Sequence, residues 1–250
     1  YMPTTEAKNY QTTMTDVCGV YRCGGFQVTD ILCDNEFHAS MDPIAASQNP
    51  PITMHYAAAQ EHVPEAERNN RVIKEQFRAV YHRLPYTHLP RILVKYLTYE
   101  SARKPNIFPA RQGVSKYFSP RMIIHQENIS YQQHCKTSCG TYVLAHNEPD
   151  PTNTNAPRAL DCLYLCPNAS GRHECLHLQT NRVITRRRVT PLPITPAIIT
   201  LVHTIAEQDG MPKGLKISNR YGTVLFDSSW MAGVDSDNEQ FEHEDYEDEP

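Results

Sequence analysis

The 250-residue sequence lacks any apolar run near the roughly 20 residues that a helix needs to cross a bilayer. It also lacks the basic and then apolar stretch of a secretory signal, because it opens on Tyr1-Met2-Pro3. These absences exclude a membrane protein with spanning helices, and the lack of Met at position 1 predicts a piece of a longer chain. Without a secretory signal, the eight cysteines predict reduced thiols and a location inside the cell, in the nucleus or cytoplasm.

Basic residues are missing from the end of the chain. The last sixteen residues, 235–250, hold nine acids and no lysine or arginine, and this composition predicts a disordered tail. Without the tail the 28 acids fall to 19 against 24 bases, so the net charge changes from −4 to +5. The bases are densest from Arg68 to Arg121, where twelve of them face only Glu75 and Glu100. This basic block favours a polyanionic partner through counterion release, although a solvated surface without a partner explains it too.

Hydrophobic periodicity predicts an α/β organisation in the first half of the chain. Two short strands are expected at 26–33 and 52–56, separated by a proline-containing loop at 41–51. Gly24 and Gly25 are expected to end the first helix, because glycine favours a left-handed helix cap. The expected helices lie at 7–21, 64–84 and 90–100.

The second half of the chain has closely spaced, short strand-like runs with turn residues between them. This pattern is typical of a small antiparallel barrel. The runs lie at 141–145, 159–165, 173–178 and 182–190. A helix is expected at 196–207, followed by a hairpin-like segment around Tyr221-Gly222.

Two acids, Asp34 and Glu67, occupy positions where an α/β protein can bring carboxylates together. Asp34 ends the first predicted strand, and Glu67 lies near the start of the helix at 64–84. Paired carboxylates can hold hard divalent cations, and two such cations can catalyse phosphoryl transfer. Asp34 can equally be a turn residue, and Glu67 a helical ion-pair partner of Arg71 worth only about 0.2–0.5 kcal/mol.

Two clusters of bases are candidates for nucleic-acid binding. Arg71, Lys74 and Arg78 follow Glu67 at three- and four-residue steps, so they share one face of the predicted helix. They would hold a sugar-phosphate backbone beside the carboxylates. Arg186-Arg187-Arg188 indicates either a DNA contact or a nuclear-localisation signal, and an exposed edge of the barrel accounts for it as well.

Several blocks of the sequence resemble, in order, the integrase region of copia-type LTR retrotransposon polyproteins. Cys33-Asp34-Asn35-Glu36-Phe37 resembles the Asp-Asn block of retroviral-type integrases. Ala66-Glu67-Arg68-Asn69-Asn70-Arg71 resembles the Ala-Glu-Arg-x-Asn-Arg block of the copia type. Further similar blocks lie at 84–90, 113–116, 119–121, 140–143, 183–188 and 191–193.

The resemblance implies a partial RNase H-like integrase catalytic core, followed by a small antiparallel β-barrel. In that family an Asp-Asp-Glu triad holds two Mg²⁺ or Mn²⁺ ions for DNA strand transfer. Asp34 matches the second Asp and Glu67 matches the Glu, whereas the strand that carries the first Asp is missing. The resemblance therefore implies a fragment that binds DNA or RNA, self-associates as integrases do, and has little or no strand-transfer activity alone.

The expected domains follow from these blocks and from the changes in composition. They are the partial core at 1–112, a linker at 113–133, the barrel at 134–195, a helix with a hairpin-like segment at 196–226, and the disordered tail at 227–250.

Two other functions fit parts of the sequence. One is a host-retained DNA- or RNA-binding protein without a catalytic role. The other is a zinc-stabilised interaction module, although the cysteines of each pair are one residue further apart than zinc sites favour. Its candidate ligands are Cys135, Cys139, Cys162, Cys166, His173 and His177.

Tyrosines lie among the bases of the basic block, as in a surface on which single-stranded bases stack. At helical spacing, tyrosines more commonly belong to a core. The residues in question are Tyr81, Tyr86, Tyr96, Tyr99 and Tyr117.

Overall fold

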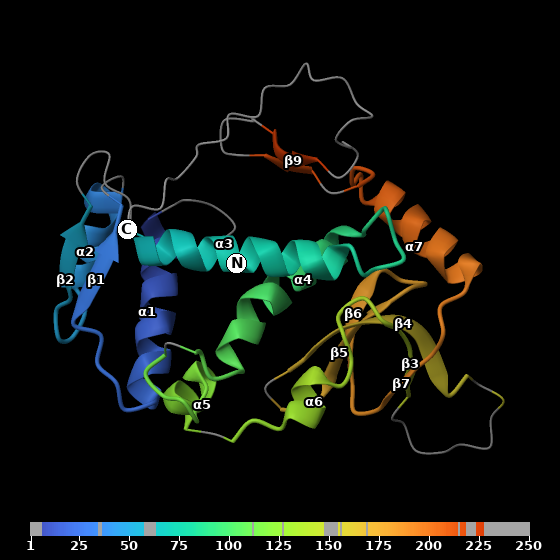
Figure 1. Cartoon of the computed structure of the whole chain (residues 1–250), viewed down its shortest axis with the longest axis horizontal. Helices are drawn as coiled ribbons and strands as arrows, with labels where there is room; N and C mark the ends of the chain where they lie inside the picture. Colours follow the sequence, from blue (N-terminus) through green and yellow to red (C-terminus); the bar gives the residue numbers. More distant parts are fainter. Residues whose placement is uncertain are drawn as a thin grey trace. The chain divides into compact units, whose positions relative to one another are not determined.

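The computed structural model describes residues 7–34, 37–57, 64–111, 113–126, 128–147, 155, 157–168, 170–214, 216–218 and 224–227. It contains two compact units (Figure 1). The first unit comprises Tyr1–Tyr81 and Leu97–Lys136, and the second comprises His82–Tyr96 and Thr137–Pro250. Both units combine helices with strands, which confirms the predicted α/β class.

A parallel βαβ arrangement begins the first unit. Strands β1 (Asp30–Cys33) and β2 (Thr53–Tyr56) pair in parallel, with Asp30 opposite Thr53, and helix α2 (His38–Ala46) connects them. Helix α1 (Ala7–Cys23) packs on α2. The two predicted strands are confirmed, in shortened form. The core of this arrangement consists of Met14, Cys18, Ile44, Ala45 and Ile52.

The predicted loop at 41–51 was wrong over its first half, because α2 extends from His38 to Ala46. Pro43 lies inside this helix and cannot donate a backbone hydrogen bond there, so the sequence favoured a loop. Burial offsets this loss, since Ile44 and Ala45 belong to the core shared with α1.

Helices make up the rest of the first unit. Helix α3 spans Pro64–Tyr81, and α4 spans Arg91–Arg103 and enters the unit at Leu97. The short 3₁₀ helix η2 (Lys104–Asn106), α5 (Pro120–His125) and α6 (Tyr131–Cys135) follow. The predicted linker at 113–133 thus contains α5 and the start of α6. No helix of the described residues is long and apolar enough to cross a membrane.

A five-stranded antiparallel sheet forms the centre of the second unit. The strands lie in the order β6-β5-β4-β3-β7, so β6 and β7 are consecutive in sequence but form opposite edges. Only Arg187 and Arg188 connect these two edge strands. The strands are β3 (Tyr142–His146), β4 (Ala159–Pro167), β5 (His173–His177), β6 (Arg182–Arg186) and β7 (Val189–Pro191).

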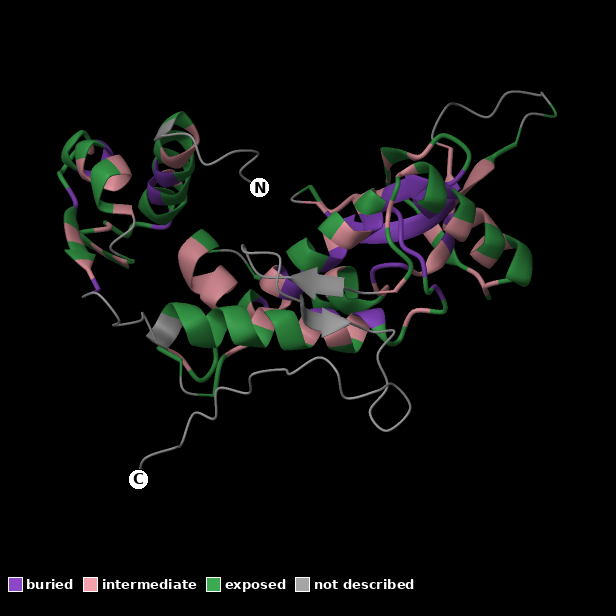
Figure 2. Cartoon of the chain, turned by 90° about the horizontal axis from the view of Figure 1, so that it is seen from above, coloured by how far each residue is buried: buried purple, intermediate pink, exposed green. Residues whose placement is uncertain are grey.

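Both faces of this sheet are buried in its centre. Side chains alternate between the faces of a strand, yet every residue of β4 from Cys162 to Cys166 is buried. Cys162 and Tyr164 pack with Val143 and Cys175 on one face, whereas Leu163 lies on the other. Figure 2 shows this concentration of buried residues in the sheet.

The segment 84–91 is held by residues far along the chain. The Tyr86 hydroxyl donates a hydrogen bond to the Gly140 carbonyl at 3.2 Å, and the Arg91 backbone N–H donates to the Asp209 carboxylate at 2.9 Å. Tyr86 is buried, as is His88. The block at 84–90 that resembles integrases is therefore an integral part of the second unit.

The end of the second unit contains a helix and a hairpin. Helix α7 (Pro196–Gln208) begins after Thr195, whose hydroxyl accepts a hydrogen bond from the Ile198 N–H at 3.4 Å. Strands β8 (Lys216–Ser218) and β9 (Val224–Asp227) pair in antiparallel fashion, which confirms the hairpin-like segment. Apart from Asp227, the predicted disordered tail lies outside the described residues.

Candidate nucleic-acid interface

Asp34 directly follows β1, at the carboxyl end of the parallel strand pair, and is exposed. A second acid, Asp30, lies at the opposite end of β1, and its Oδ1 is 2.9 Å from Nε2 of His55 on β2. The hydrogen bond with His55 lowers the pKa of Asp30. Asp42 of α2 likewise accepts a hydrogen bond from the Tyr56 hydroxyl. The carboxylates Asp30 and Asp42 therefore already have protein partners.

Glu67 lies on the first turn of α3 and is exposed. It belongs to the same unit as Asp34. Two carboxylates provide few of the six or more oxygen ligands that each Mg²⁺ or Ca²⁺-like cation takes. The described part of the chain holds no group of three or more His, Cys, Asp or Glu side chains suited to a metal ion. Binding of Mg²⁺ or Mn²⁺ by Asp34 and Glu67 stays a prediction. It applies to an intact integrase in which the first Asp of the triad is also present.

The basic face of α3 is directed largely to solvent. Arg71 and Lys74 are exposed and Arg78 is half-buried. Nε of Arg71 lies 3.4 Å from Oε1 of Glu75, one helical turn away. An exposed pair of this kind is worth only about 0.3–0.5 kcal/mol, so a phosphate can displace the carboxylate at little cost.

The two acids between Arg68 and Arg121 are both bound by bases of the same segment. Glu75 contacts Arg71, and Glu100 forms a buried pair with Arg103. Twelve bases against these two acids give the segment a net charge of +10 that it cannot neutralise internally. The exposed bases of this segment are Arg68, Arg71, Lys74, Arg83, Arg91, Lys95, Arg111 and Lys116.

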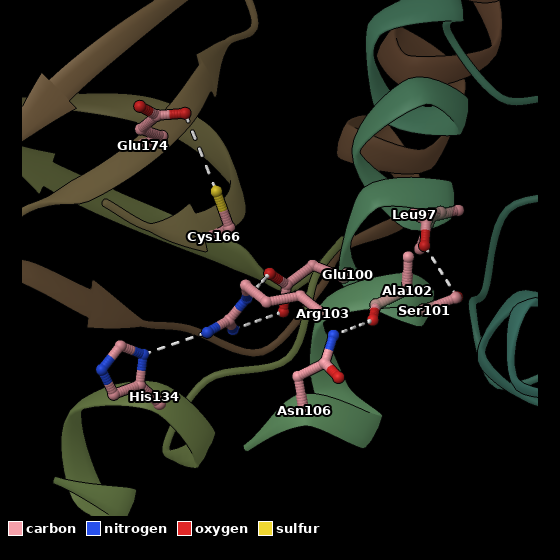
Figure 3. A network of polar contacts seen from close by, with 9 residues as sticks. All are labelled: Leu97, Glu100, Ser101, Ala102, Arg103, Asn106, His134, Cys166 and Glu174. Atoms are coloured by element: carbon pink, nitrogen blue, oxygen red, sulfur yellow. Dashed lines mark hydrogen bonds and ion pairs between the residues drawn. The ribbon is translucent and has the colours of Figure 1, made fainter. Parts of the chain in front are cut away.

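The sequence analysis did not predict the buried ion pair of Glu100 and Arg103. Glu100 and Arg103 expose only 5% and 7% of their surface. Nε and Nη2 of Arg103 donate to the two carboxylate oxygens at 2.5 and 2.8 Å, and Nη1 lies 3.0 Å from Nδ1 of His134 (Figure 3). Because Arg103 can only donate, His134 accepts through an unprotonated Nδ1.

His134 gives the first unit a pH dependence. Burial and the charges of Arg103 and Arg121 lower the pKa of His134 from its ordinary value of 6.5. The unfolded chain therefore binds this proton more readily than the folded chain does. The contribution of neutral His134 to the stability of the folded first unit is complete above about pH 6.5. It is lost as the pH falls toward the lower pKa that His134 has in the folded chain.

We expect the urea midpoint of the first unit to fall when the pH is lowered by about one unit below 6.5. In His134→Gln, the side-chain amide can still accept from Arg103 but cannot take up a proton, so this part of the pH dependence should disappear. Urea unfolding of both proteins at matched pH values isolates His134 from the other histidines. An unchanged pH slope in the variant would contradict the assignment.

The three arginines Arg186, Arg187 and Arg188 differ in burial. Arg186 is half-buried, and its Nη2 donates to Oδ1 of Asn147 at 3.5 Å. Arg187 and Arg188 are exposed, in the link between the two edge strands. The Arg188 carbonyl accepts a hydrogen bond from the His146 N–H at 3.1 Å, which fixes the backbone of the link. Arg186 thus has a partner within the protein, and binding of nucleic acid by Arg186, Arg187 and Arg188 stays a prediction.

The cysteines of the second unit pack as small core residues. Cys162 and Cys175 belong to the core of the sheet. Burial raises the pKa of Cys162 to about 12 and also raises that of Cys175, which disfavours the thiolate that zinc requires. The Cys166 thiol donates to the Glu174 carboxylate at 3.7 Å, also drawn in Figure 3. These contacts support the structural interpretation of the thiols.

The tyrosines of the basic block separate by burial. Tyr81 and Tyr86 are core residues, and the Tyr96 hydroxyl donates to the Glu174 carboxylate at 2.8 Å. Tyr99 and Tyr117 are exposed. Of the five tyrosines, Tyr99 and Tyr117 therefore have the exposure that stacking on nucleic-acid bases requires.

Comparison with family models finds no match, and no curated protein matches the chain. The resemblance to copia-type integrases therefore rests on the sequence blocks alone. The architecture itself establishes a mixed α/β protein with a five-stranded antiparallel sheet.

Proposed function

We propose that the chain binds nucleic acid through its basic block, as part of an integrase of the copia retrotransposon type. The observation that carries this proposal is the segment from Arg68 to Arg121, where both acids are already paired with bases of the segment. Eight of its twelve bases are exposed. Exposed bases in such excess over acids attract phosphate groups, and each contact gains free energy by releasing counterions.

The connection between β6 and β7 supports a small barrel. In a flat sheet the edges of five strands lie about 19 Å apart, at about 4.8 Å per strand. The two-residue link from Arg186 to Val189 can span only about 11 Å. Arg186, at the end of edge strand β6, also contacts Asn147, which directly follows β3. In the strand order β5 and β4 lie between β6 and β3, so the contact requires the sheet to bend. A strongly curled sheet satisfies both observations.

The place of Asp34 supports a fragment of an RNase H-like core. In open parallel α/β sheets, functional groups gather at the carboxyl ends of the strands. Asp34 follows β1 at that end of the β1–β2 pair. The chain provides Glu67 as a second acid, and the proposed function for this fragment is binding rather than strand transfer.

A non-catalytic binder of DNA or RNA retained by a host is the second candidate. It is favoured by the exposed bases of α3, which can contact phosphate groups without a metal ion. This candidate predicts equal binding with and without Mg²⁺, and no effect of Glu67→Gln. A cation effect on binding that Glu67→Gln removes would favour the integrase fragment.

The salt dependence of binding tests the basic face of α3. We expect the double variant Arg71→Gln, Lys74→Gln to reduce the slope of log K against log salt by about two for duplex DNA, because each lost phosphate contact removes about 0.9. Fluorescence anisotropy of a labelled duplex at a series of salt concentrations measures the slope. The control variant Lys8→Gln, Arg22→Gln removes the same charge from exposed positions on α1.

Two results would overturn the proposal: salt-independent binding of the unaltered chain, or equal slopes for the α3 variant and the α1 control. A strand-transfer assay with Mg²⁺ or Mn²⁺ separates the integrase fragment from a complete enzyme. We expect little or no joining, and robust joining that Glu67→Gln abolishes would contradict the incomplete site.

A further inference from the structure

Two large aromatic side chains are exposed next to each other in the first unit. Tyr117 exposes 83% of its surface and Phe118 exposes 56%. Both lie in the turn at 115–119, called here the aromatic turn, which precedes α5. Adjacent exposed apolar groups commonly mark a binding site.

The aromatic turn is held by its own hydrogen bonds. The Ser115 hydroxyl accepts from the backbone N–H groups of Tyr117 and Phe118, at 3.1 and 3.0 Å. Ser119 is fully buried, and its hydroxyl accepts from the Met122 N–H at 3.2 Å and so caps α5. These contacts fix the backbone on both sides of the rings. Two exposed rings on an ordered backbone lose little conformational entropy when they bind.

A second aromatic pair flanks the aromatic turn in sequence. The rings of Phe108 and Tyr131 are stacked, with centroids 5.5 Å apart and planes inclined by 18°. Both side chains are exposed. Phe108 precedes the aromatic turn in sequence and Tyr131 follows it. The segment 108–131 therefore contains four exposed aromatic rings.

The charge of this segment is almost entirely positive. Between Ser101 and Lys136 the sequence has six bases and a single acid, Glu127. Lys116 adjoins the rings and is exposed, and Arg121 lies on the first turn of α5. Exposed rings between positive charges fit an anionic polymer with flat, accessible faces, and they fit an apolar protein surface less well.

We infer that the aromatic turn stacks unpaired bases, so that the chain binds single-stranded nucleic acid more tightly than duplex of the same length. This inference rests on the proposed nucleic-acid binding and adds the class of strand. In a duplex the faces of the bases are already stacked on one another, whereas in a single strand they are open to Tyr117 and Phe118. Lys116 and Arg121 provide the phosphate contacts that any strand can use.

The test uses the full chain with a labelled oligothymidylate of about 20 nucleotides and a duplex of the same length. We expect Tyr117→Ala, Phe118→Ala to weaken single-strand binding by roughly 5- to 150-fold, the range for a lost base–aromatic contact. Duplex affinity and the salt slope should change little, because no charge is removed. Tyr117→Trp should keep single-strand affinity, since it retains a ring.

The matched control is Val114→Ala, which removes apolar surface from a fully exposed residue beside the aromatic turn. It should leave both affinities unchanged. If the double variant binds the oligothymidylate as tightly as the unaltered chain while duplex binding persists, the stacking inference is overturned and the proposed function stands. If the unaltered chain binds neither probe, both fail. Equal losses for single strand and duplex would also overturn it.

Discussion

Glu100→Gln is expected to lower the free energy of unfolding of the first unit by about 3–5 kcal/mol, because it leaves the buried Arg103 guanidinium without a counter-charge. The glutamine is close to the same size, so little packing is lost. Hydrogen exchange measured by mass spectrometry should show faster exchange in peptides from 97–136. Peptides from β3 to β5, in the second unit, provide the internal reference.

Glu75→Gln is the matched control, since it breaks the exposed pair with Arg71 in the same segment. Its cost should stay below about 1 kcal/mol. Replacing both buried partners, as in Glu100→Leu with Arg103→Met, should recover much of the loss because no isolated charge remains. Similar effects of Glu100→Gln and Glu75→Gln would refute the assigned burial.

Gly24→Ala is expected to destabilise the first unit by about 3 kcal/mol or more, beyond the usual range for an overpacked site. A Cβ atom on Gly24 would lie 2.0 Å from the backbone oxygen of Ile124 in α5. Backbone cannot move aside as a flexible side chain can, so the packing of α1 against α5 must change. Urea unfolding, with hydrogen exchange of peptides from both helices, measures the effect.

Gly19→Ala, a substitution within α1, is expected to give the opposite result. Nothing lies within 4 Å of the Cβ position at Gly19, and alanine is the better helix former by about 1 kcal/mol. We expect this variant to be slightly more stable than the unaltered chain. A loss of stability in Gly19→Ala as large as that in Gly24→Ala would disprove the close approach of the helices.

The two glycines after α1 illustrate how far the sequence could predict the fold. Gly24-Gly25 was expected to end a helix, and Gly25 does adopt a positive φ of 81°. The close approach of Ile124 to Gly24 was not predictable, because it joins residues 100 positions apart. Local signals specify caps and periodicity, whereas contacts distant in sequence depend on the packing of the whole unit.

The candidate site shows the same division. The place of Asp34 after a strand and the helical row of bases follow from local patterns, and both are found. The pairing of Glu100 with Arg103 could not be distinguished in sequence from an ordinary surface pair three residues apart. Only burial separates a pair worth several kcal/mol from one worth a few tenths. Likewise, tyrosine spacing alone could not separate the core residue Tyr86 from the exposed Tyr117.

The interleaving of the two units along the chain affects the order in which the protein can fold. His82–Tyr96 leaves the ribosome well before Gly140 and Asp209, which hold it in the second unit. During synthesis Tyr86 has to wait for Gly140 to emerge, and Arg91 has to wait for Asp209, more than a hundred residues later. A fragment beginning at Thr137 would lack this segment, so no single cut of the polypeptide separates the two units with both intact.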